Sequence, residues 1–297
     1  MSGIASGTGQ GIGSGVASGT GSGIRLDAGP ALLFCPGNRP ERFAKAAARA
    51  DAVIVDLEDA VPAAQKEDAR RAVVASGLDP RTTLIRVNAG SSAELDRDLA
   101  ALDGSGFRLL VAGKCESVDA VAALSDYDVV PQIETPKGYL QLEAIAAHPA
   151  VVALFWGTED FVEQLGGTAA RDGSGRLIDP LRAVRARLML TAAAFGKPAI
   201  DAPYPDYSES GLTGLGAQAR DAARSGFLAS ACVHPAQVPV VRTAYRPDEA
   251  AIARARQVLA DAEGTGGVFA SGGGMVDAPV VEQARRVLAR AAAPAAG

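Results

Sequence analysis

The feature of this chain that most constrains its fold is a repeated alternation, from Pro30 onward, between short apolar runs and Ala-, Arg- and Glu-rich stretches. Such an alternation is typical of βαβ units, in which helices cover a parallel sheet. Eight of the apolar runs have the length and composition of strands: Ala31–Cys35, Ala52–Leu57, Thr83–Val87, Arg108–Ala112, Asp128–Ile133, Val152–Trp156, Ala199–Ala202 and Phe227–Val233. Eight strand–helix repeats within ~200 to 250 residues predict a closed (β/α)8 TIM barrel, because an open doubly wound sheet usually has fewer strands.

The stretches between these runs are predicted to be helices: Pro40–Arg49, Ala64–Ala75, Ala93–Asp103, Ser117–Ala123, Pro136–Ala147, Pro180–Phe195 and Thr213–Ser225. Two more helices, Pro247–Ala262 and Pro279–Ala292, are expected after the eighth strand. The Gly-rich segment between them is either a solvated loop or a flexible arm that reaches a neighbouring subunit. We therefore predict a barrel over residues 29–246 and a C-terminal helical extension over residues 247–297.

Residues 1–28 are rich in Gly, Ser and Thr, with only isolated Ile and Val residues. Such a segment lacks the apolar surface that would offset its ordering entropy, and its glycines increase that cost. It contains no continuous apolar run, so it is neither a signal peptide nor a membrane span. We expect this leader to be disordered and expect no membrane partner.

Composition narrows the class of protein further. Hydrophobic residues make up 48% of the chain and charged residues 21%, close to the averages for soluble globular proteins. The net charge of −5 and the lack of a basic stripe argue against nucleic acid as a partner. The cysteines Cys35, Cys115 and Cys232 lie widely spaced in or beside apolar runs, without a CxxC motif or a Cys/His cluster. This pattern is typical of reduced core thiols, so we predict a cytoplasmic protein.

Ionisable or polar residues follow five consecutive predicted strands, and these are Asp56, Glu58, Asp59, Arg86, Asn88, Lys114, Glu116, Glu134, Glu159 and Asp160. The active site of a barrel of this kind lies at the C-terminal ends of its strands. One charge at a strand end is often merely exposed to solvent. Five charged ends that converge on one mouth would instead form a cavity whose groups are paired, hydrated or bound to a metal.

The residue types at this mouth favour a hard cation. Carboxylates without His or Cys partners suit Mg2+, which usually takes one or two protein carboxylates together with water and substrate oxygens. Glu134 directly follows an apolar strand, and Asp160 follows Gly157, which lets the backbone approach a ligand closely. Spacing alone leaves Glu159 as an alternative to Asp160.

Arg86 is the best candidate to bind a substrate carboxylate, because its guanidinium can donate two parallel hydrogen bonds. The structural alternative is a salt bridge with Asp56, Glu58 or Asp59. His234 has the position of a general base at the end of the eighth strand, but a lone histidine there is more often a hydrogen-bonding support. His148, which precedes a proline at a helix end, is interpreted as structural.

Nine short motifs containing these residues run in order along the chain: Leu33-Phe34-Cys35-Pro36-Gly37, Arg39-Pro40-Glu41-Arg42-Phe43, Val55-Asp56-Leu57-Glu58-Asp59-Ala60-Val61, Arg86-Val87-Asn88, Ile133-Glu134-Thr135, Gly157-x-x-Asp160, Asp201-x-x-Tyr204, Val233-His234-Pro235-x-Gln237 and Met275-Val276-Asp277-x-Pro279. With them, the chain from about Leu32 to Leu288 resembles the citrate lyase beta-subunit and malyl-CoA lyase family of Mg2+-dependent aldolases and lyases. A match of this extent is far more specific than any one of its motifs.

The resemblance implies roles for individual residues. It implies that Glu134 and Asp160, rather than Glu159, bind Mg2+, and that Arg86 binds a 2-oxo acid. It also implies that Asp277 acts as acid/base after delivery from the next subunit of a homotrimer, or of a hexamer. We expect substrate contacts from Phe34, Gly157 and Thr158, and supporting roles for Asp56, Glu58, Asp59, Lys114 and His234.

The implied activity is cleavage of a 3-hydroxyacyl-CoA, such as citryl-CoA, citramalyl-CoA or malyl-CoA, to a 2-oxo acid and an acyl-CoA. The alternatives are a thioesterase or malate-synthase-like activity on the same fold, and a non-catalytic beta-like subunit of a larger complex. Two positions depart from the family pattern. Gly113 stands where a proline is common, and Glu159 adds a negative charge beside the expected metal.

Overall fold

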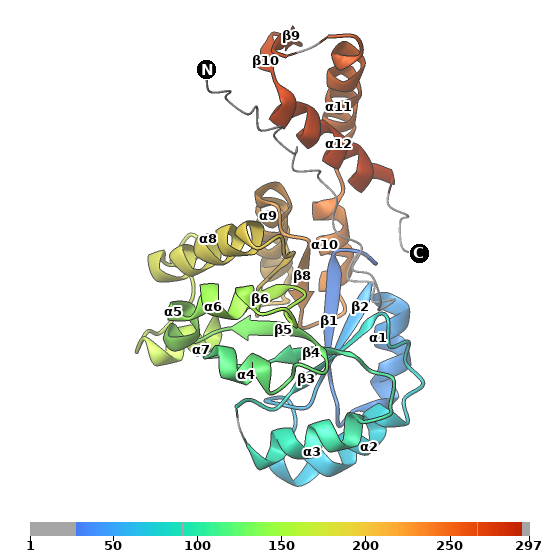
Figure 1. Cartoon of the computed structure of the whole chain (residues 1–297), viewed down its shortest axis with the longest axis vertical. Coiled ribbons are helices and arrows are strands. Elements are labelled where there is room, and N and C mark those ends of the chain that lie inside the picture. Colours follow the sequence, from blue (N-terminus) through green and yellow to red (C-terminus); the bar gives the residue numbers. More distant parts are fainter. Residues whose placement is uncertain (1–27, 91, 266, 293–297) are drawn as a thin grey trace, which may run out of the picture.

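The computed structural model describes residues 28–90, 92–265 and 267–292. Eight parallel strands close into a barrel in sequential order, which confirms the predicted (β/α)8 fold (Figure 1). The strands are β1 (Ala31–Pro36), β2 (Ala52–Asp56), β3 (Thr83–Val87), β4 (Leu109–Ala112), β5 (Asp128–Ile133), β6 (Leu154–Trp156), β7 (Ala199–Asp201) and β8 (Ala229–Cys232). The predicted disorder of the leader concerns residues that lie, except for Ala28, outside the described part.

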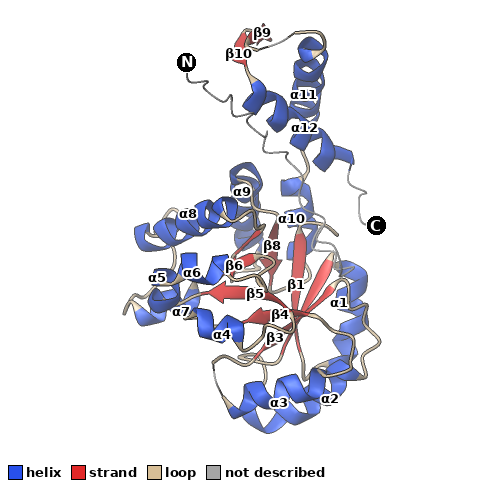
Figure 2. Ribbon diagram, in the orientation of Figure 1, coloured by secondary structure: helices blue, strands red, loops and turns tan. Residues whose placement is uncertain are grey.

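Helices surround the barrel (Figure 2). They are α1 (Phe43–Arg49), α2 (Lys66–Val74), α3 (Ala93–Leu102), α4 (Val118–Ala122), α5 (Pro136–Leu140), α6 (Leu142–Ala147), α7 (Glu159–Gln164), α8 (Asp179–Ala194), α9 (Glu209–Ser225) and α10 (Gln237–Tyr245), with 3-10 turns at Pro40–Arg42 and Ala63–Gln65. Helices α7 and α10 were not predicted. The single helix predicted over Pro136–Ala147 was wrong, because the backbone leaves the helical conformation at Gln141.

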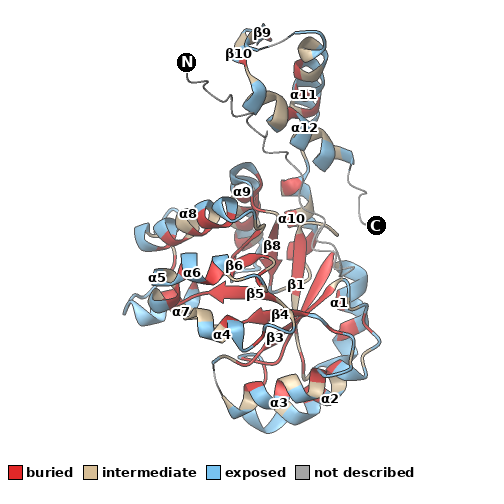
Figure 3. Cartoon of the chain, in the orientation of Figure 1, coloured by how far each residue is buried: buried red, intermediate tan, exposed pale blue. Residues whose placement is uncertain are grey.

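The strands of the barrel consist mostly of buried residues (Figure 3), and apolar side chains pack on both sides of the barrel wall. Alternate residues of a strand point to opposite faces, so Phe155 of β6 packs inside the barrel while its neighbours Leu154 and Trp156 pack against the helices. The interior cluster takes side chains from every strand, including Leu32, Ile54, Leu84, Leu109, Val130, Ile200 and Ala229. The barrel is thus a packed core, and only its ends are available to a ligand.

The C-terminal extension projects beyond the barrel (Figure 1) and consists of α11 (Glu249–Ala262), β9 (Phe269–Ser271), β10 (Gly274–Val276) and α12 (Ala278–Ala292). Val258, Val276 and Ala284 form part of a small separate core. Strands β9 and β10 pair as an antiparallel hairpin, so the solvated-loop alternative was wrong for that part of the Gly-rich segment. Arg290 of α12 donates to the carbonyl of Ala223 in α9 at 2.6 Å, which ties the extension to the barrel.

Within the described residues, no helix combines the length and apolar character needed to cross a membrane.

A buried ionic network braces the strand ends that lead to the mouth. The Arg70 Nε of α2 donates to Asp98 Oδ1 of α3 at 2.7 Å, and both side chains are almost fully buried. Asp98 Oδ2 accepts from the backbone and side-chain nitrogens of Asn88, at 2.8 and 2.7 Å. Lys66 Nζ donates to Asn88 Oδ1 and to the carbonyls of Leu57 and Glu58. The network therefore fixes the segments that follow β2 and β3.

Asp98→Ala should lower the free energy of unfolding by about 3 to 5 kcal/mol, because it removes one partner of a buried ion pair and leaves Arg70 Nε and both Asn88 nitrogens without their acceptor. Asp68→Ala is the matched control: Asp68 pairs with Arg71 on the exposed face of α2, and loss of an exposed pair costs about 0 to 1 kcal/mol. Urea denaturation measures both. Equal effects of the two substitutions would contradict a structural role for the network.

Candidate active site at the barrel mouth

Hydrogen bonds and ion pairs link charged side chains that follow strands β2 to β6. The linked carboxylates are Asp56, Glu58, Asp59, Glu134 and Asp160, and the linked cations are Arg86 and Lys114. With every group ionised, five carboxylates and two cations have a formal charge of −3. Since several of these groups are buried, the cluster needs additional positive charge or protons.

Arg86 is held rigidly by its neighbours. The β2–β3 register pairs it with Asp56, and its Nε and Nη2 donate to the two Asp56 oxygens at 2.8 and 2.5 Å. Nη1 lies 3.2 Å from Glu58 Oε2, and the guanidinium lies over the half-buried Phe34 ring at 5.0 Å. Burial lowers the pKa of Arg86, but its bonds with Asp56 and the charge of Glu58 raise it above the ordinary value. The salt-bridge alternative is thus confirmed for Asp56 and Glu58.

These contacts do not use the whole guanidinium. An arginine carries five N–H donors, and the contacts with Asp56 and Glu58 engage three of them. Two N–H donors therefore remain for a ligand. Asp59 does not pair with Arg86 in this way, because its Oδ2 accepts from Lys114 Nζ at 2.6 Å.

Glu134 is almost fully buried, with 2% of its surface exposed, as is Asp56. Its Oε1 accepts from the backbone nitrogen of Lys114 at 2.8 Å, and its Oε2 accepts from Gln132 Nε2 at 2.6 Å. Burial and then the charge of Glu58 raise the pKa of Glu134 to about 8, and Asp160 adds to the shift. A carboxylate in this state is ionised readily only when a cation joins it.

Two glycines provide space for these carboxylates. A Cβ on Gly157 would lie 2.7 Å from Glu134 Oε2, so any side chain there would displace the carboxylate. A Cβ on Gly113 would lie 2.4 Å from Glu58 Oε2. A proline at this position would therefore require the Glu58 carboxylate to move.

Asp160 and Glu159 occupy different environments. Asp160 is half-buried, and its Oδ1 lies 3.7 Å from Lys114 Nζ, which also donates to Glu58 Oε1 at 2.9 Å. Glu159 is exposed, and its Oε1 accepts from the buried Thr158 hydroxyl at 2.8 Å. Asp160 therefore belongs to the cluster, whereas Glu159 is held at its edge by Thr158.

The donor set at the mouth fits a hard divalent cation. All its groups are oxygen or nitrogen atoms of Asp, Glu, Gln, Arg and Lys. The buried Gln132 Oε1 accepts no hydrogen bond within the described chain, and the buried Glu58 Oε2 has an ion pair with Arg86 Nη1 at 3.2 Å but no well-formed hydrogen bond. Among the described residues, no three or more His, Cys, Asp or Glu side chains are arranged to hold a metal by themselves. Glu134 and Asp160 would supply two ligands, the usual protein share for Mg2+, with water and substrate oxygens as the others.

The two histidines have structural contacts. The His234 ring stacks on Tyr207 at 4.5 Å between centroids, and its Nδ1 accepts from the Ala236 backbone at 3.2 Å. His148 Nδ1 likewise accepts from the Ala150 backbone at 3.2 Å. Both rings thus make local structural contacts, and the supporting role of His234 in the site stays a prediction.

Asp277 lies between β10 and α12, on the extension that projects from the barrel (Figure 1). Its Oδ1 accepts from the Val280 backbone at 3.3 Å and so caps α12. In the part of the chain that the structure describes, Asp277 forms no hydrogen bond or ion pair with the mouth residues. One chain alone thus does not bring Asp277 to Glu134.

Two features were missed at the sequence level. Gln132 was not identified, although its two-residue spacing from Glu134 on a strand indicates a common face. The second feature is a set of hydrogen bonds behind β6 and β7, where Asp201 accepts from Trp156 Nε1 and from Arg185 Nε, both at 2.9 Å.

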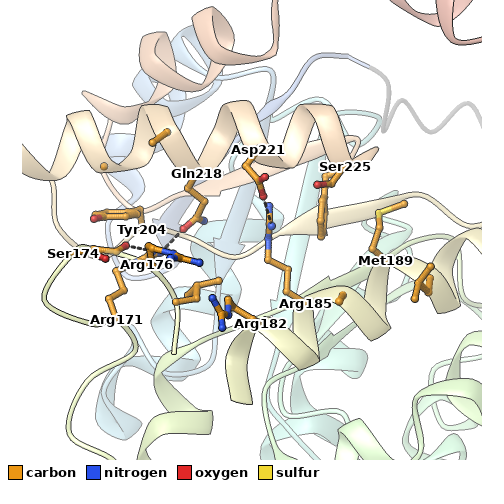
Figure 4. Close-up of a pocket in the computed structure, with 17 residues that line it drawn as sticks. Arg171, Ser174, Arg176, Arg182, Arg185, Met189, Tyr204, Gln218, Asp221 and Ser225 are labelled. Carbon is orange, nitrogen blue, oxygen red and sulfur yellow. Dashed lines mark hydrogen bonds and ion pairs between the residues drawn. The ribbon is translucent and has the colours of Figure 1, made fainter. Parts of the chain in front are cut away.

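Arg185 also lines a cavity of about 690 Å³ between α8 and α9 (Figure 4). This cavity lies outside the barrel and shares no lining residue with the carboxylate cluster.

The closed parallel barrel and its oxygen-rich mouth define the class of protein: a (β/α)8 barrel whose strand ends are suited to bind a divalent cation. Comparison with protein families then gives the particular assignment. Residues 31–235 match the HpcH/HpaI aldolase/citrate lyase family, and the chain belongs to it. This match confirms the resemblance inferred from the motifs.

Individual relatives are similar to this chain over nearly its whole length. The chain is 47% identical over 264 residues to the citrate lyase subunit beta-like protein of Mycobacterium tuberculosis, covering 89% of this chain and 96% of that protein. A (3S)-malyl-CoA thioesterase of Cereibacter sphaeroides is 34% identical over 281 residues, with coverages of 90% and 95%. The crystal structure of CitE from M. tuberculosis with magnesium, acetoacetate and coenzyme A has a TM-score of 0.86 and 46% identity, with coverages of 90% and 99%.

In metal-free buffer, the free energy of unfolding of the wild type should fall relative to that of Glu134→Gln as the pH rises from about 5 to 9. The folded-state pKa of Glu134, about 8, exceeds the ordinary value of 4.5. The stabilisation from this raised pKa is therefore complete below pH 4.5 and is lost as the pH rises through 8. Urea denaturation in EDTA measures the difference between the two proteins.

Excess Mg2+ should reduce this fall, because the cation binds the ionised carboxylate. Parallel stability profiles of wild type and Glu134→Gln across this pH range would contradict the burial of an uncompensated Glu134.

Proposed function

We propose that this chain is a Mg2+-dependent carbon–carbon lyase that cleaves a 3-hydroxyacyl-CoA of the citryl-, citramalyl- or malyl-CoA type to a 2-oxo acid and an acyl-CoA. The observation that carries the proposal is the cluster at the mouth, which has a surplus of negative charge. In it, Glu134 Oε1 accepts from the Lys114 backbone nitrogen and Asp160 Oδ1 lies 3.7 Å from Lys114 Nζ. The high identity to a citrate lyase beta-like protein supports the same class of reaction. The CitE complex with magnesium, acetoacetate and coenzyme A supports the same kinds of ligand.

Glu134 and Asp160 would hold the cation, which when bound supplies a Lewis acid for the oxygens of the oxo-acid portion. Arg86 would donate its two remaining N–H bonds to the substrate carboxylate, and Asp56 and Phe34 would keep its guanidinium in place. The centroid of the buried Phe155 ring lies 6.2 Å from that of Phe34, and this ring would limit how deep the substrate can enter. The backbone of Gly157 and the Thr158 side chain would line the same pocket.

Cleavage breaks one C–C bond, and its electron pair becomes the enolate of the acyl-CoA. A base accepts the proton of the substrate hydroxyl, the O–H electron pair forms the C=O bond of the 2-oxo acid, and another proton must reach the enolate carbon. Asp277 would deliver the second proton, and in the condensation direction it would remove a proton from the acyl-CoA.

Asp277 would come from a neighbouring subunit of a homotrimer. The hairpin β9–β10 and the start of α12 extend away from their own barrel (Figure 1). Val268 and Met275 are strongly exposed on this extension, 65% and 72% respectively, so it offers apolar surface to another chain. We also propose a cytoplasmic location, supported by three free and buried cysteines.

A thioesterase is the second candidate, since one relative is a malyl-CoA thioesterase. A panel of citryl-, citramalyl- and malyl-CoA, assayed for both free CoA thiol and acyl-CoA, distinguishes the reactions. The lyase yields acyl-CoA without free thiol, whereas the thioesterase yields thiol and the hydroxy acid. Thiol release alone would refute the lyase, and no turnover of any thioester would favour a non-catalytic subunit.

Glu134→Gln and Asp160→Asn should each reduce kcat/KM by about 100-fold or more. Each substitution removes a carboxylate ligand of the divalent cation, and the cation stabilises the negative charge of the transition state. Glu159→Gln is the matched control. It neutralises the adjacent carboxylate, which Thr158 holds at the edge of the cluster, and should retain activity close to the wild-type value. A larger loss of kcat/KM in Glu159→Gln than in Asp160→Asn would show that Glu159, and not Asp160, binds the cation.

Asp277→Asn should also be inactive, and mixing it with Glu134→Gln should restore activity. In a mixed trimer, some sites combine an intact Glu134 from one subunit with an intact Asp277 from the next. The mixture is refolded or co-expressed, and its activity is compared with that of each variant alone. Activity no greater than the sum of the separate variants would show that Asp277 does not act between subunits.

A further inference from the structure

The position of Glu134 is determined by three neighbours that come from different strands. On β5, Gln132 lies two residues before Glu134, so the two side chains share a face of the barrel wall. On the other side, Gly157 after β6 leaves no room for a side chain beside Glu134 Oε2. The turn after β4 supplies the third neighbour, Lys114.

Lys114 has an unusual backbone conformation. Its φ is +47°, and no other non-glycine residue in the described part of the chain has a positive φ. A side chain makes this conformation unfavourable, and such residues persist where the surroundings require them. Here the conformation accompanies the 2.8 Å hydrogen bond from the Lys114 backbone nitrogen to Glu134 Oε1. One of the two donors to Glu134 is therefore built into the main chain.

The other donor is the Gln132 amide. Gln132 is almost fully buried, and its Nε2 donates to Glu134 Oε2 at 2.6 Å. Its Oε1 is also buried, and it has no hydrogen-bond partner within the described chain. A buried polar atom without a partner costs free energy, which reduces what the Gln132 amide contributes to stability. The folded core alone does not explain a glutamine at this position.

We propose that Gln132 is a positioning residue for the metal: with the left-handed Lys114 turn, it fixes the Glu134 carboxylate in the orientation that binds the divalent cation. This inference rests on the proposed metal-binding function of Glu134. The two donors engage one oxygen each, and each carboxylate oxygen keeps lone pairs for a cation. Glu134 is thus oriented before the cation arrives.

Hydrogen-bond partners of metal ligands typically change metal affinity by about 10- to 100-fold when they are removed. Gln132→Met keeps the length of the side chain and removes both the donor to Glu134 and the unsatisfied oxygen. In the full-length protein, this variant should weaken Mg2+ binding by about 10- to 100-fold, as measured by calorimetric titration. Its melting temperature in EDTA should stay close to that of the wild type, because removal of the unsatisfied buried oxygen offsets the loss of the donor to Glu134 Oε2.

Gln237→Met is the matched control. Gln237 is also fully buried, but both halves of its amide are bonded: Nε2 donates to the Tyr204 carbonyl at 2.7 Å, and Oε1 accepts from the backbone of Val233 and His234. Its substitution should lower the melting temperature and leave the Mg2+ dissociation constant unchanged. Gln132→Met should therefore change the Mg2+ dissociation constant, whereas Gln237→Met should change the melting temperature.

A lower melting temperature with unchanged Mg2+ affinity in Gln132→Met would overturn the positioning role and leave a purely structural one. Glu134→Gln separates this failure from that of the proposed function. If the wild type binds Mg2+ and Glu134→Gln does not, an unchanged affinity in Gln132→Met refutes only the inference about Gln132. If the wild type itself does not bind Mg2+, the metal-dependent function fails as well.

Discussion

The architecture of the mouth depends on one electrostatic constraint, the surplus of carboxylates over cations in a place largely removed from water. Asp56 and Glu58 are compensated by Arg86, and Asp59 is compensated by Lys114. Within the described residues, Glu134 accepts from two neutral donors, and its burial together with the nearby charges of Glu58 and Asp160 raises its pKa to about 8. The fold maintains this unfavourable arrangement, and a bound divalent cation would make it favourable.

The barrel makes such an arrangement possible because its register and packing are rigid. The pairing of β2 with β3 places Asp56 beside Arg86, and the buried Arg70–Asp98 pair fixes the segments that follow these strands. The apolar side chains inside the barrel pack beneath the charged residues of the mouth. The energy that stabilises the mouth therefore comes mainly from the apolar core and from networks outside the site.

The sequence predicted the repetitive parts of this structure well, because strand–helix alternation and strand ends are local signals. It correctly indicated eight strands and a mouth charged by Asp56, Glu58, Arg86 and Lys114. It missed Gln132, because a polar residue inside an apolar strand acquires meaning only through its contact with Glu134. It did not predict the break at Gln141 or the left-handed turn at Lys114, since tertiary packing determines both. The delivery of Asp277 between subunits stays a prediction, because it depends on an assembly rather than on one chain.

The central claim is that Glu134 and Asp160 together hold one divalent cation at the mouth of the barrel. A crystal grown with Mn2+ in place of Mg2+ and with pyruvate tests it directly, because anomalous scattering locates the metal independently of the protein atoms. The account predicts one strong peak within about 2.0 to 2.3 Å of a carboxylate oxygen from each of these residues. A peak coordinated by Glu58, Asp59 or Glu159 instead, or two carboxylates too far apart to share an ion, would contradict it.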